Sequence, residues 1–213
     1  MWERLVCIAI GYVCGLFQTS YIYGKAHGID IRDYGSGNAG TTNALRTLGR
    51  KAGAITFLGD CFKCVVAVLI VWLIFGKTQG ENLKLLGLYA AAGTILGHNF
   101  PFYLKFRGGK GIAATAGLLF SFDWRLMLVA LAVFLLVFFT THYVSLGSLM
   151  VYVVFGGGLF FMGQTGQFDM EPARIYEMYG LGLFLAGLAV WKHRANIVRL
   201  IHGNENKTYL KKK

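Results

Sequence analysis

Three polar stretches carry the residues whose types and spacing could do chemistry. The first runs from Gly35 to Arg46, where glycines alternate with small hydroxyl and amide side chains before an arginine. Glycine lets the backbone approach a ligand, and successive backbone N–H groups can then point at one anion. If a helix starts near Thr41, its N-terminus adds positive potential, and the arginine fork matches a phosphate. The stretch predicts an anion-binding loop; a flexible linker is the alternative.

The second stretch, Gly97 to Gly111, places basic side chains among glycines. It is not a Walker A loop, because Leu104 stands where that motif needs its first glycine and Gly111 follows the lysine. The residues that could still surround an oxyanion are Lys105, Arg107, Gly108, Gly109 and Lys110. Two alternatives stay open: the charges only flank a membrane span, and His98 is a hydrogen-bonding group at a helix end.

The third stretch, Trp191 to Gly203, follows a long apolar run. If it is helical, His193 and Asn196 are three residues apart and share a face. The alternative is an amphipathic helix that lies in the membrane interface with its basic side in water.

A pair of opposite charges lies within an apolar run. Asp60 and Lys63 are three residues apart in the second predicted span. Charges inside a membrane span are costly and are usually paired or functional. The spacing predicts a structural ion pair first, with a direct substrate contact as the alternative.

The composition indicates the class of protein that positions these residues. Of the 213 residues, 55% are hydrophobic and only 15% are charged, and the mean hydropathy is +0.53. The chain has 21 Lys and Arg against 10 Asp and Glu, which gives a net charge of +11. A soluble domain is nearer 25% charged, so a soluble enzyme and a disordered chain are both disfavoured. Nucleic acid is disfavoured as a partner because so much of the chain suits lipid. The composition predicts an all-α integral membrane protein.

Seven segments are candidates for transmembrane helices. They are Leu5–Tyr23, Ala52–Phe75, Leu83–Phe100, Gly111–Phe122, Trp124–Thr141, Tyr143–Gly163 and Ile175–Trp191. A crossing helix needs about 20 residues, so the fourth is short enough to be re-entrant instead. The pairs Gly11 with Gly15, and Gly93 with Gly97, have the spacing of close helix packing in lipid.

The basic residues set the orientation. Most Lys and Arg outside the spans fall on the side that carries the three polar stretches, and that side is expected in the cytoplasm. Seven spans then put the N-terminus outside and the C-terminus inside. We expect one polytopic domain, 1–213, with motif stretches at 35–49, 97–111 and 191–203. The last ten residues, which end at Lys213, are expected to be a solvated end near anionic headgroups.

The chain lacks the motifs that several other classes of enzyme require. No histidine is followed five positions later by aspartate, so the His-Asp dyad of many acyltransferases is absent. The chain has no Gly-x-Ser-x-Gly elbow, and it has no acidic cluster suited to magnesium or zinc.

Taken together, the stretches resemble the bacterial acyltransferases that acylate glycerol 3-phosphate from acyl-phosphate, the PlsY family. That family has Ser-Gly-Asn-Pro-Gly-Ala-Thr-Asn and then Leu-Arg, as in Ser36 to Asn43 with Leu45-Arg46. Its Gly-His, Pro and Phe-Lys-Gly-Gly-Lys-Gly pattern is similar to Gly97 to Gly111. The family's last motif has a histidine after a span, then Asn-Ile and Arg-Leu, and is similar to His193, Asn196-Ile197 and Arg199-Leu200. Its Asp-x-x-Lys motif in the second span is similar to Asp60 and Lys63. Departures are Ala39 for Pro, Thr41 for Ala, Arg107 for Lys, Ala195 and Asn204.

The resemblance implies transfer of a fatty acyl group to the 1-hydroxyl of glycerol 3-phosphate, with lysophosphatidic acid and inorganic phosphate as products. It implies no metal, no cofactor and no direct use of acyl-CoA or acyl carrier protein. No protein partner is expected, and the site should face the cytoplasm from the bacterial inner membrane.

On this resemblance we assign roles as hypotheses. The acyl-phosphate headgroup is assigned to Ser36, Gly37, Asn38, Gly40, Thr41, Thr42 and Asn43. The phosphate pocket is completed by Lys105, Gly108, Gly109 and Lys110. Glycerol 3-phosphate is assigned to Arg46, His193 and Asn196, and Lys105 is an additional candidate for it. The catalytic candidates are Ser36, Arg46, His98, Lys105 and His193, with His98 orienting the loop or polarising the acyl carbonyl.

Two questions stay open at this stage. The attacking hydroxyl can lose its proton to His193 or to a phosphate oxygen of the substrate. An organophosphate transporter would also be basic and polytopic, but transporter sites usually lie near the midplane between repeats, and no repeat is visible here. A non-catalytic lipid-binding scaffold leaves the three polar stretches unexplained.

Overall fold

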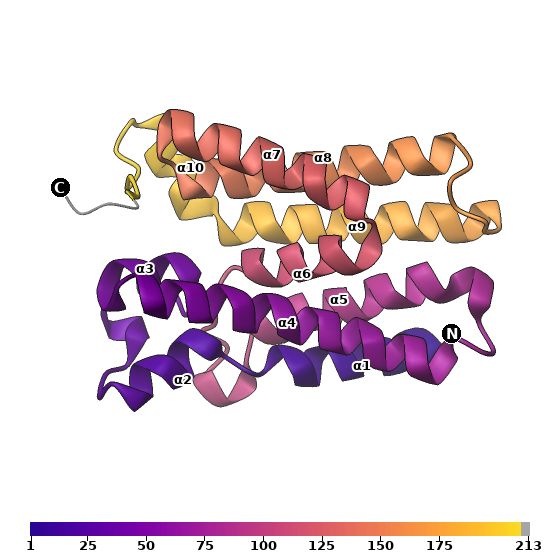
Figure 1. Cartoon of the computed structure of the whole chain (residues 1–213), viewed down its shortest axis with the longest axis horizontal. Coiled ribbons are helices and arrows are strands. Elements are labelled where there is room, and N and C mark those ends of the chain that lie inside the picture. Colours follow the sequence, from indigo (N-terminus) through magenta and orange to yellow (C-terminus); the bar gives the residue numbers. More distant parts are fainter. Residues whose placement is uncertain (210–213) are drawn as a thin grey trace. The chain divides into compact units, whose positions relative to one another are not determined.

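The computed structural model describes residues 1–209, and the regular structure in that range is helical (Figure 1). The all-α prediction is therefore confirmed. The chain divides into two compact units, Met1–Phe122 and Asp123–Lys213, which are described one at a time. The prediction of a single domain stays a prediction, and the residues Leu210 to Lys213 of the expected tail lie outside the described range.

The first unit holds both glycine-rich stretches. Its helices are α1 (Trp2–Gly15), α2 (Thr19–Ala26), α3 (Thr41–Leu48), α4 (Arg50–Phe75), α5 (Leu83–Asn99) and α6 (Ile112–Phe122). Short 3-10 helices lie between them: η1 (Ile31–Asp33), η2 (Gly80–Asn82) and η3 (Phe102–Leu104). The long helix α4 contacts α1, α2, α3, α5 and α6, and so forms the spine of the unit.

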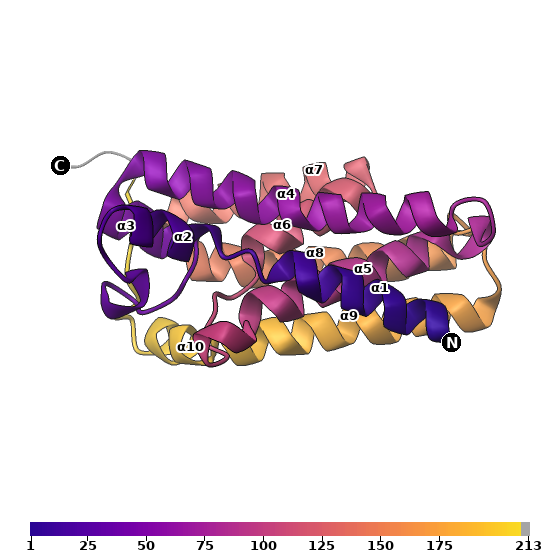
Figure 2. The ribbon, with the colours of Figure 1, turned by 90° about the horizontal axis from the view of Figure 1, so that it is seen from below.

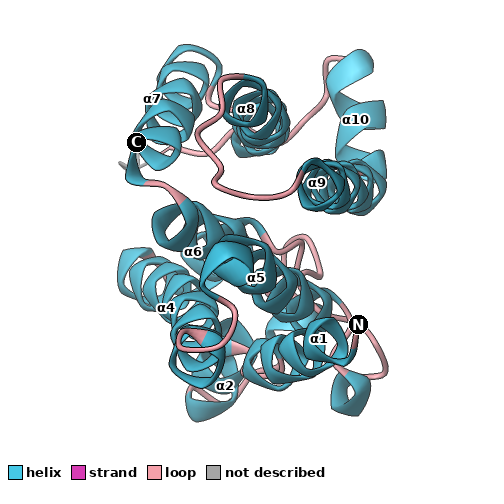
Figure 3. Cartoon of the chain, turned by 90° about the vertical axis from the view of Figure 1, so that its right-hand side faces the viewer, coloured by secondary structure: helices cyan, strands magenta, loops and turns pink. Residues whose placement is uncertain are grey.

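The second unit holds the third stretch. Its helices are α7 (Trp124–Thr141), α8 (Val144–Gln164), α9 (Pro172–Lys192) and α10 (Arg194–Ile201). Helix α8 packs between α7 and α9 (Figure 3). A single residue, Asp123, precedes α7, and its carboxylate accepts hydrogen bonds from the N–H groups of Arg125 and Leu126.

Within residues 1–209, five helical segments are long and apolar enough to cross a membrane: Trp2–Ala26, Arg50–Phe75, Trp124–Thr141, Val144–Gln164 and Pro172–Lys192. Their outer faces carry large apolar side chains such as Leu73, which is 84% exposed. Such faces suit lipid and would be costly in water. Helix α5 has 17 residues and is largely buried within its unit, and α6 has 11. The chain is a multi-pass membrane protein, while the count of seven spans stays a prediction.

Glycines let α1 and α5 pack backbone against backbone. A Cβ on Gly11 would meet the Ala90 carbonyl, and one on Gly97 would meet the Tyr12 carbonyl. Gly15 and Gly93 face the opposite helix in the same way. The predicted role of these glycine pairs in close helix packing is confirmed.

The variant Gly93→Leu should therefore destabilise the first unit. The added side chain would press on the Ile8 backbone, and overpacking typically costs about 1–3 kcal/mol even where side chains can adjust. Thermal unfolding in detergent measures the effect. Gly157→Leu is the matched control, since no atom lies within 4 Å of a Cβ at that position. Equal melting temperatures for the two variants would contradict the packing argument.

The first predicted span is present, but it is not one continuous helix. Helix α1 ends at Gly15 and α2 begins at Thr19 (Figure 2). The sequence Leu5–Tyr23 shows no proline to mark this break. The cause lies in distant residues that hydrogen-bond to the freed carbonyl groups, as described below.

Candidate active site

Asn43 shapes the first glycine-rich stretch. Its side-chain oxygen accepts a hydrogen bond from the Ser36 N–H at 2.9 Å, and its amide donates to the carbonyls of Ile31 (2.9 Å) and Tyr34 (3.0 Å). Gly35 has a φ of +59°, and a Cβ there would strike the Asn43 side chain. Asn43, predicted to bind substrate, thus holds the loop in shape with both of its polar atoms.

Helix α3 begins at Thr41, as the anion-binding interpretation of the first stretch requires. Gly40 precedes α3 and has no side chain to cap the first-turn N–H groups, which have no partner within a helix. The Thr41 hydroxyl is buried and has no hydrogen-bond partner among residues 1–209. Arg46 lies in the last turn of the same helix and is exposed. The start of α3 therefore presents both N–H groups and a hydroxyl for an acceptor.

The second stretch folds back onto the end of α5. The N–H of Gly109 donates to the His98 carbonyl at 3.2 Å, and that of Gly108 to the Asn99 carbonyl at 3.3 Å. Lys105 and Phe106 both have positive φ values, 56° and 59°. Non-glycine residues in this region are strained and persist only where the surroundings hold them, often at ligand sites.

Gly109 joins the first and second stretches. A Cβ at this position would meet both the His98 ring nitrogen Nε2 and the Ala39 carbonyl. Only a glycine therefore fits between the end of α5 and the first stretch. The contact is one between two parts of the chain, and the expected approach of this backbone to an anion stays a prediction.

A cavity of about 300 Å³ opens where the two stretches meet. Its lining residues are Tyr21, Arg32, Asp33, Gly37, Tyr103, Leu104, Lys105 and Arg107. Three of them are cationic and one is acidic, so the cavity suits an anion such as a phosphate group. Gly37 comes from the first stretch, and Lys105 with Arg107 from the second.

Arg32 is a cavity residue that sequence reasoning missed. Its guanidinium pairs with both carboxylate oxygens of Asp30 (2.9 and 2.7 Å) and donates to the Leu104 carbonyl at 3.2 Å. It also lies over the Tyr21 ring at 5.1 Å. The Leu104 carbonyl directly precedes the left-handed Lys105, so Arg32 latches the loop that presents this lysine. The spacing Asp30-x-Arg32 beside the glycine-rich stretch was the available signal.

The latch sets a testable pH dependence. Hydrogen bonds from Arg32 lower the pKa of Asp30 to about 2. An aspartate whose pKa is lowered in the folded state stabilises the fold above its ordinary pKa of about 4, and this stabilisation is lost as the pH falls toward 2. We therefore expect Asp30→Asn to flatten the melting temperature between pH 4 and 2, with no change in slope above pH 5. Asp169→Asn, at an exposed position, is the control; identical pH curves for wild type and Asp30→Asn would refute the latch.

The third stretch lies in the second unit, and a bend separates its helices. His193 is the residue between α9 and α10, is 2% exposed, and its Nδ1 lies 2.8 Å from the Ala189 carbonyl. A carbonyl only accepts, so Nδ1 carries the hydrogen and Nε2 of the neutral ring is the basic nitrogen. Asn196 remains next to His193, because its N–H donates to the His193 carbonyl at 2.8 Å.

Glu205 is a second residue that sequence reasoning missed. One of its oxygens accepts from the Asn196 amide at 2.8 Å and the other from Arg199 at 2.9 Å. Thr208 is also buried, and its N–H donates to the His142 carbonyl at 2.9 Å. The prediction of a solvated end after residue 203 is wrong for these two residues. The sequence feature that could have pointed to Glu205 is that it is the sole acidic residue after α9.

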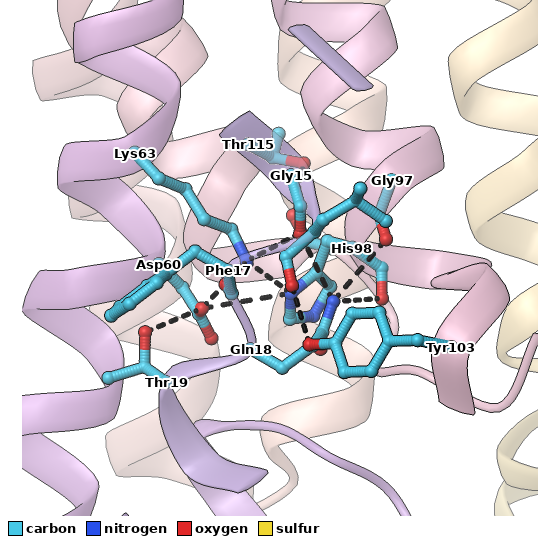
Figure 4. A network of polar contacts seen from close by, with 12 residues as sticks. Gly15, Phe17, Gln18, Thr19, Asp60, Lys63, Gly97, His98, Tyr103 and Thr115 are labelled. Atoms are coloured by element: carbon cyan, nitrogen blue, oxygen red, sulfur yellow. Dashed lines mark hydrogen bonds and ion pairs between the residues drawn. The ribbon is translucent and has the colours of Figure 1, made fainter. Parts of the chain in front are cut away.

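The predicted ion pair within α4 is confirmed. Lys63 Nζ lies 2.9 Å from Asp60 Oδ1 (Figure 4). The same ammonium lies 2.8 Å from His98 Nδ1 and 2.7 Å from the Phe17 carbonyl. The pair therefore reaches a histidine predicted to take part in the reaction.

The structure brings together residues of the first and second stretches within one unit. These are the loop from Ser36 to Asn43 and the residues His98, Lys105, Gly108 and Gly109. His193 and Asn196 are adjacent within the other unit, and their meeting with the first site stays a prediction.

Comparisons with known proteins show the family of the chain. Residues 5–203 match the family model described as glycerol-3-phosphate acyltransferase. A protein of that name from Clostridioides difficile is 42% identical over 215 residues, covering 100% of this chain and 98% of that protein. One from Thermoanaerobacter sp. is also 42% identical, over 97% of this chain and 96% of its own length.

Solved structures give the same result. The crystal structure of PlsY, an integral membrane glycerol 3-phosphate acyltransferase in its glycerol 3-phosphate form, superimposes with a TM-score of 0.79 at 30% identity. The match covers 97% of this chain and 96% of that one. With the family model and the relatives, it shows that this chain belongs to the glycerol-3-phosphate acyltransferase (PlsY) family and is a membrane acyltransferase.

Proposed function

We propose that the protein transfers a fatty acyl group from acyl-phosphate to the sn-1 hydroxyl of glycerol 3-phosphate. The products are lysophosphatidic acid and inorganic phosphate. The observation that carries the proposal is the cationic cavity where Gly37 meets Lys105 and Arg107. Both proposed substrates carry phosphate, and the related structure was solved in a glycerol 3-phosphate form and in a lysophosphatidic acid form.

The loop before α3 is proposed to bind the acyl-phosphate headgroup. Backbone N–H groups at the start of α3 and the unpartnered Thr41 hydroxyl can donate to a phosphate oxygen. Further groups of this site are Ser36, Gly37, Asn38, Gly40 and Thr42, with Asn43 as the residue that shapes the loop. Lys105, Gly108, Gly109 and Lys110 complete the pocket, and Lys105 extends from a backbone that Arg32 holds in place.

Glycerol 3-phosphate is proposed to bind Arg46, His193 and Asn196. The Glu205 carboxylate holds the Asn196 amide, which fixes how that side chain is presented. Phosphate is a good leaving group, so positioning and charge stabilisation carry most of the rate. His98 orients the second stretch against the first.

The hydroxyl proton has two available acceptors. One is His193, whose Nε2 is the basic nitrogen because Nδ1 is bound to the Ala189 carbonyl. The other is a phosphate oxygen of the substrate itself. The second pKa of a phosphate monoester is about 6, close to that of histidine. The two acceptors are therefore separated by comparing the pH profiles of the wild type and a His193 variant.

We further propose seven spans in the bacterial inner membrane, with the N-terminus outside and the site at the cytoplasmic face. A site at that boundary receives the lipid substrate from the membrane and glycerol 3-phosphate from water. The positive-inside distribution of Lys and Arg supports this orientation.

The test is a reconstituted reaction without metal. Purified protein is incubated with palmitoyl-phosphate and glycerol 3-phosphate, and released phosphate and lysophosphatidic acid are both measured. We expect equal amounts of the two, and neither with Arg46→Ala. Palmitoyl-CoA in place of palmitoyl-phosphate should give no product. Phosphate without lysolipid would mean hydrolysis, and no product from folded protein would favour an organophosphate transporter.

A further inference from the structure

The break in the first span leaves carbonyl groups that are satisfied by one local side chain and by two from distant parts of the chain. The Gly15 carbonyl accepts from Gln18 at 3.1 Å, the Leu16 carbonyl from Tyr103 at 2.7 Å, and the Phe17 carbonyl from Lys63 at 2.7 Å (Figure 4). In a membrane, a carbonyl without a partner costs several kcal/mol. The break therefore depends on side chains from α4 and from the loop after α5.

The Lys63 ammonium lies at the centre of these contacts. Besides the Phe17 carbonyl it reaches the Gly15 carbonyl at 3.3 Å, Asp60 at 2.9 Å and His98 Nδ1 at 2.8 Å. Asp60 also accepts from the Thr19 hydroxyl at 3.0 Å, at the start of α2. Asp60, Lys63 and His98 are 1%, 6% and 3% exposed, so water does not replace these bonds.

An ammonium fixes the tautomer of the histidine beside it. Lysine has three donors and no acceptor, so His98 Nδ1 must accept, and the neutral ring carries its hydrogen on Nε2. That nitrogen faces Gly109, at the contact with the Ala39 carbonyl of the first stretch. His98 also ties to this loop through its own carbonyl, which accepts from the Gly109 N–H.

We propose that Lys63 is a positioning residue that closes the break in the first span and holds His98 as the Nε2–H tautomer against Gly109, thereby setting how the two glycine-rich stretches meet. The inference rests on the proposed acyl transfer for its kinetic readout and on His98 alone for its spectroscopic one. The inference gives the Asp60–Lys63 ion pair a role in positioning His98, in addition to mutual neutralisation of its two charges.

The decisive variant removes both charges at once. Lys63→Met alone leaves a buried carboxylate without a partner, which destabilises strongly, whereas Asp60→Asn with Lys63→Met removes the pair and is often tolerated. A role limited to charge neutralisation predicts normal activity for the double variant. Positioning predicts a fall in kcat of roughly 10²-fold in the protein that remains folded, the cost of misplacing reacting groups by about 1 Å. The melting temperature should also fall, because methionine leaves the Phe17 carbonyl without its donor. Lys77→Met, at an exposed position, is the matched control and should keep full activity.

Nitrogen NMR of ¹⁵N-histidine-labelled protein reads the tautomer directly, with His98→Gln used to assign the signal. In the wild type we expect a protonated Nε2 and an unprotonated Nδ1 for His98, and in the double variant a mixture of both tautomers. A wild-type Nδ1–H tautomer would overturn the inference without any variant. Unchanged kcat or an unchanged tautomer in the double variant would also overturn it. Wild-type protein that transfers no acyl group would instead refute the proposed function and leave the tautomer result standing.

Discussion

His193→Gln is expected to lower kcat by roughly 10²–10⁴-fold, the usual contribution of a general base. His193 is buried, and its Nδ1 is bound to the Ala189 carbonyl, so the ring is held in one orientation with Nε2 as the basic nitrogen. Glutamine keeps a donor for that carbonyl but cannot accept the proton at neutral pH. Steady-state kinetics across pH 5 to 9 measure both the loss and the disappearance of a histidine-like ionisation.

A different result would identify the other acceptor. If the KM for glycerol 3-phosphate rises while kcat and its pH profile stay near the wild type, His193 binds substrate and a phosphate oxygen takes the proton. His202→Gln is the control, because His202 follows α10, is exposed, and bonds its own helix in the same way through Nδ1.

Gly109→Ala is expected to lower kcat/KM by about 10²-fold or more. Its Cβ would occupy space now taken by the Ala39 carbonyl and the His98 ring, so the two glycine-rich stretches would have to separate. A displacement of about 1 Å in a positioned site costs on the order of 10²-fold in rate. Because Ala39 contributes a backbone atom, no side-chain rotation can relieve the contact.

The matched control for this variant is Gly180→Ala in α9, where a new Cβ meets no atom within 4 Å. It should keep wild-type kinetics. Circular dichroism checks that the Gly109 variant remains folded, because its new Cβ also presses on the buried His98 ring of α5. Wild-type kcat/KM for Gly109→Ala would show that the two stretches need not touch for turnover.

Local patterns foretold much of the fold. Apolar runs fixed the helices to within a few residues, and Trp124–Thr141 coincides with α7. The packing role of the glycine pairs in α1 and α5 could be predicted, because a spacing of four residues places both glycines of a pair on one helix face. The anion-binding interpretation of the first stretch was conditional on a helix start near Thr41, and α3 begins at that residue.

Other features depend on partners far away in the chain. The pattern of Leu5–Tyr23 does not show that the helix stops at Gly15, because two of the donors that satisfy its freed carbonyls, Lys63 and Tyr103, lie far away in the chain. Asn43 was expected to bind substrate but is engaged by the backbone of Ile31, Tyr34 and Ser36. Side-chain hydrogen bonds of this kind have no periodicity that a sequence pattern can reveal.

The interrupted first span also constrains how the chain is made. During translation, α1 and α2 leave the ribosome before α4. The carbonyls of Gly15 and Phe17 therefore emerge well ahead of Lys63, which donates to them. Until Lys63 and the glycine face of α5 arrive, the early segment has no complete set of donors within lipid. Truncated chains that end before α4 should therefore insert poorly and be degraded, so that biosynthesis of this enzyme becomes committed only once its second long helix has entered the membrane.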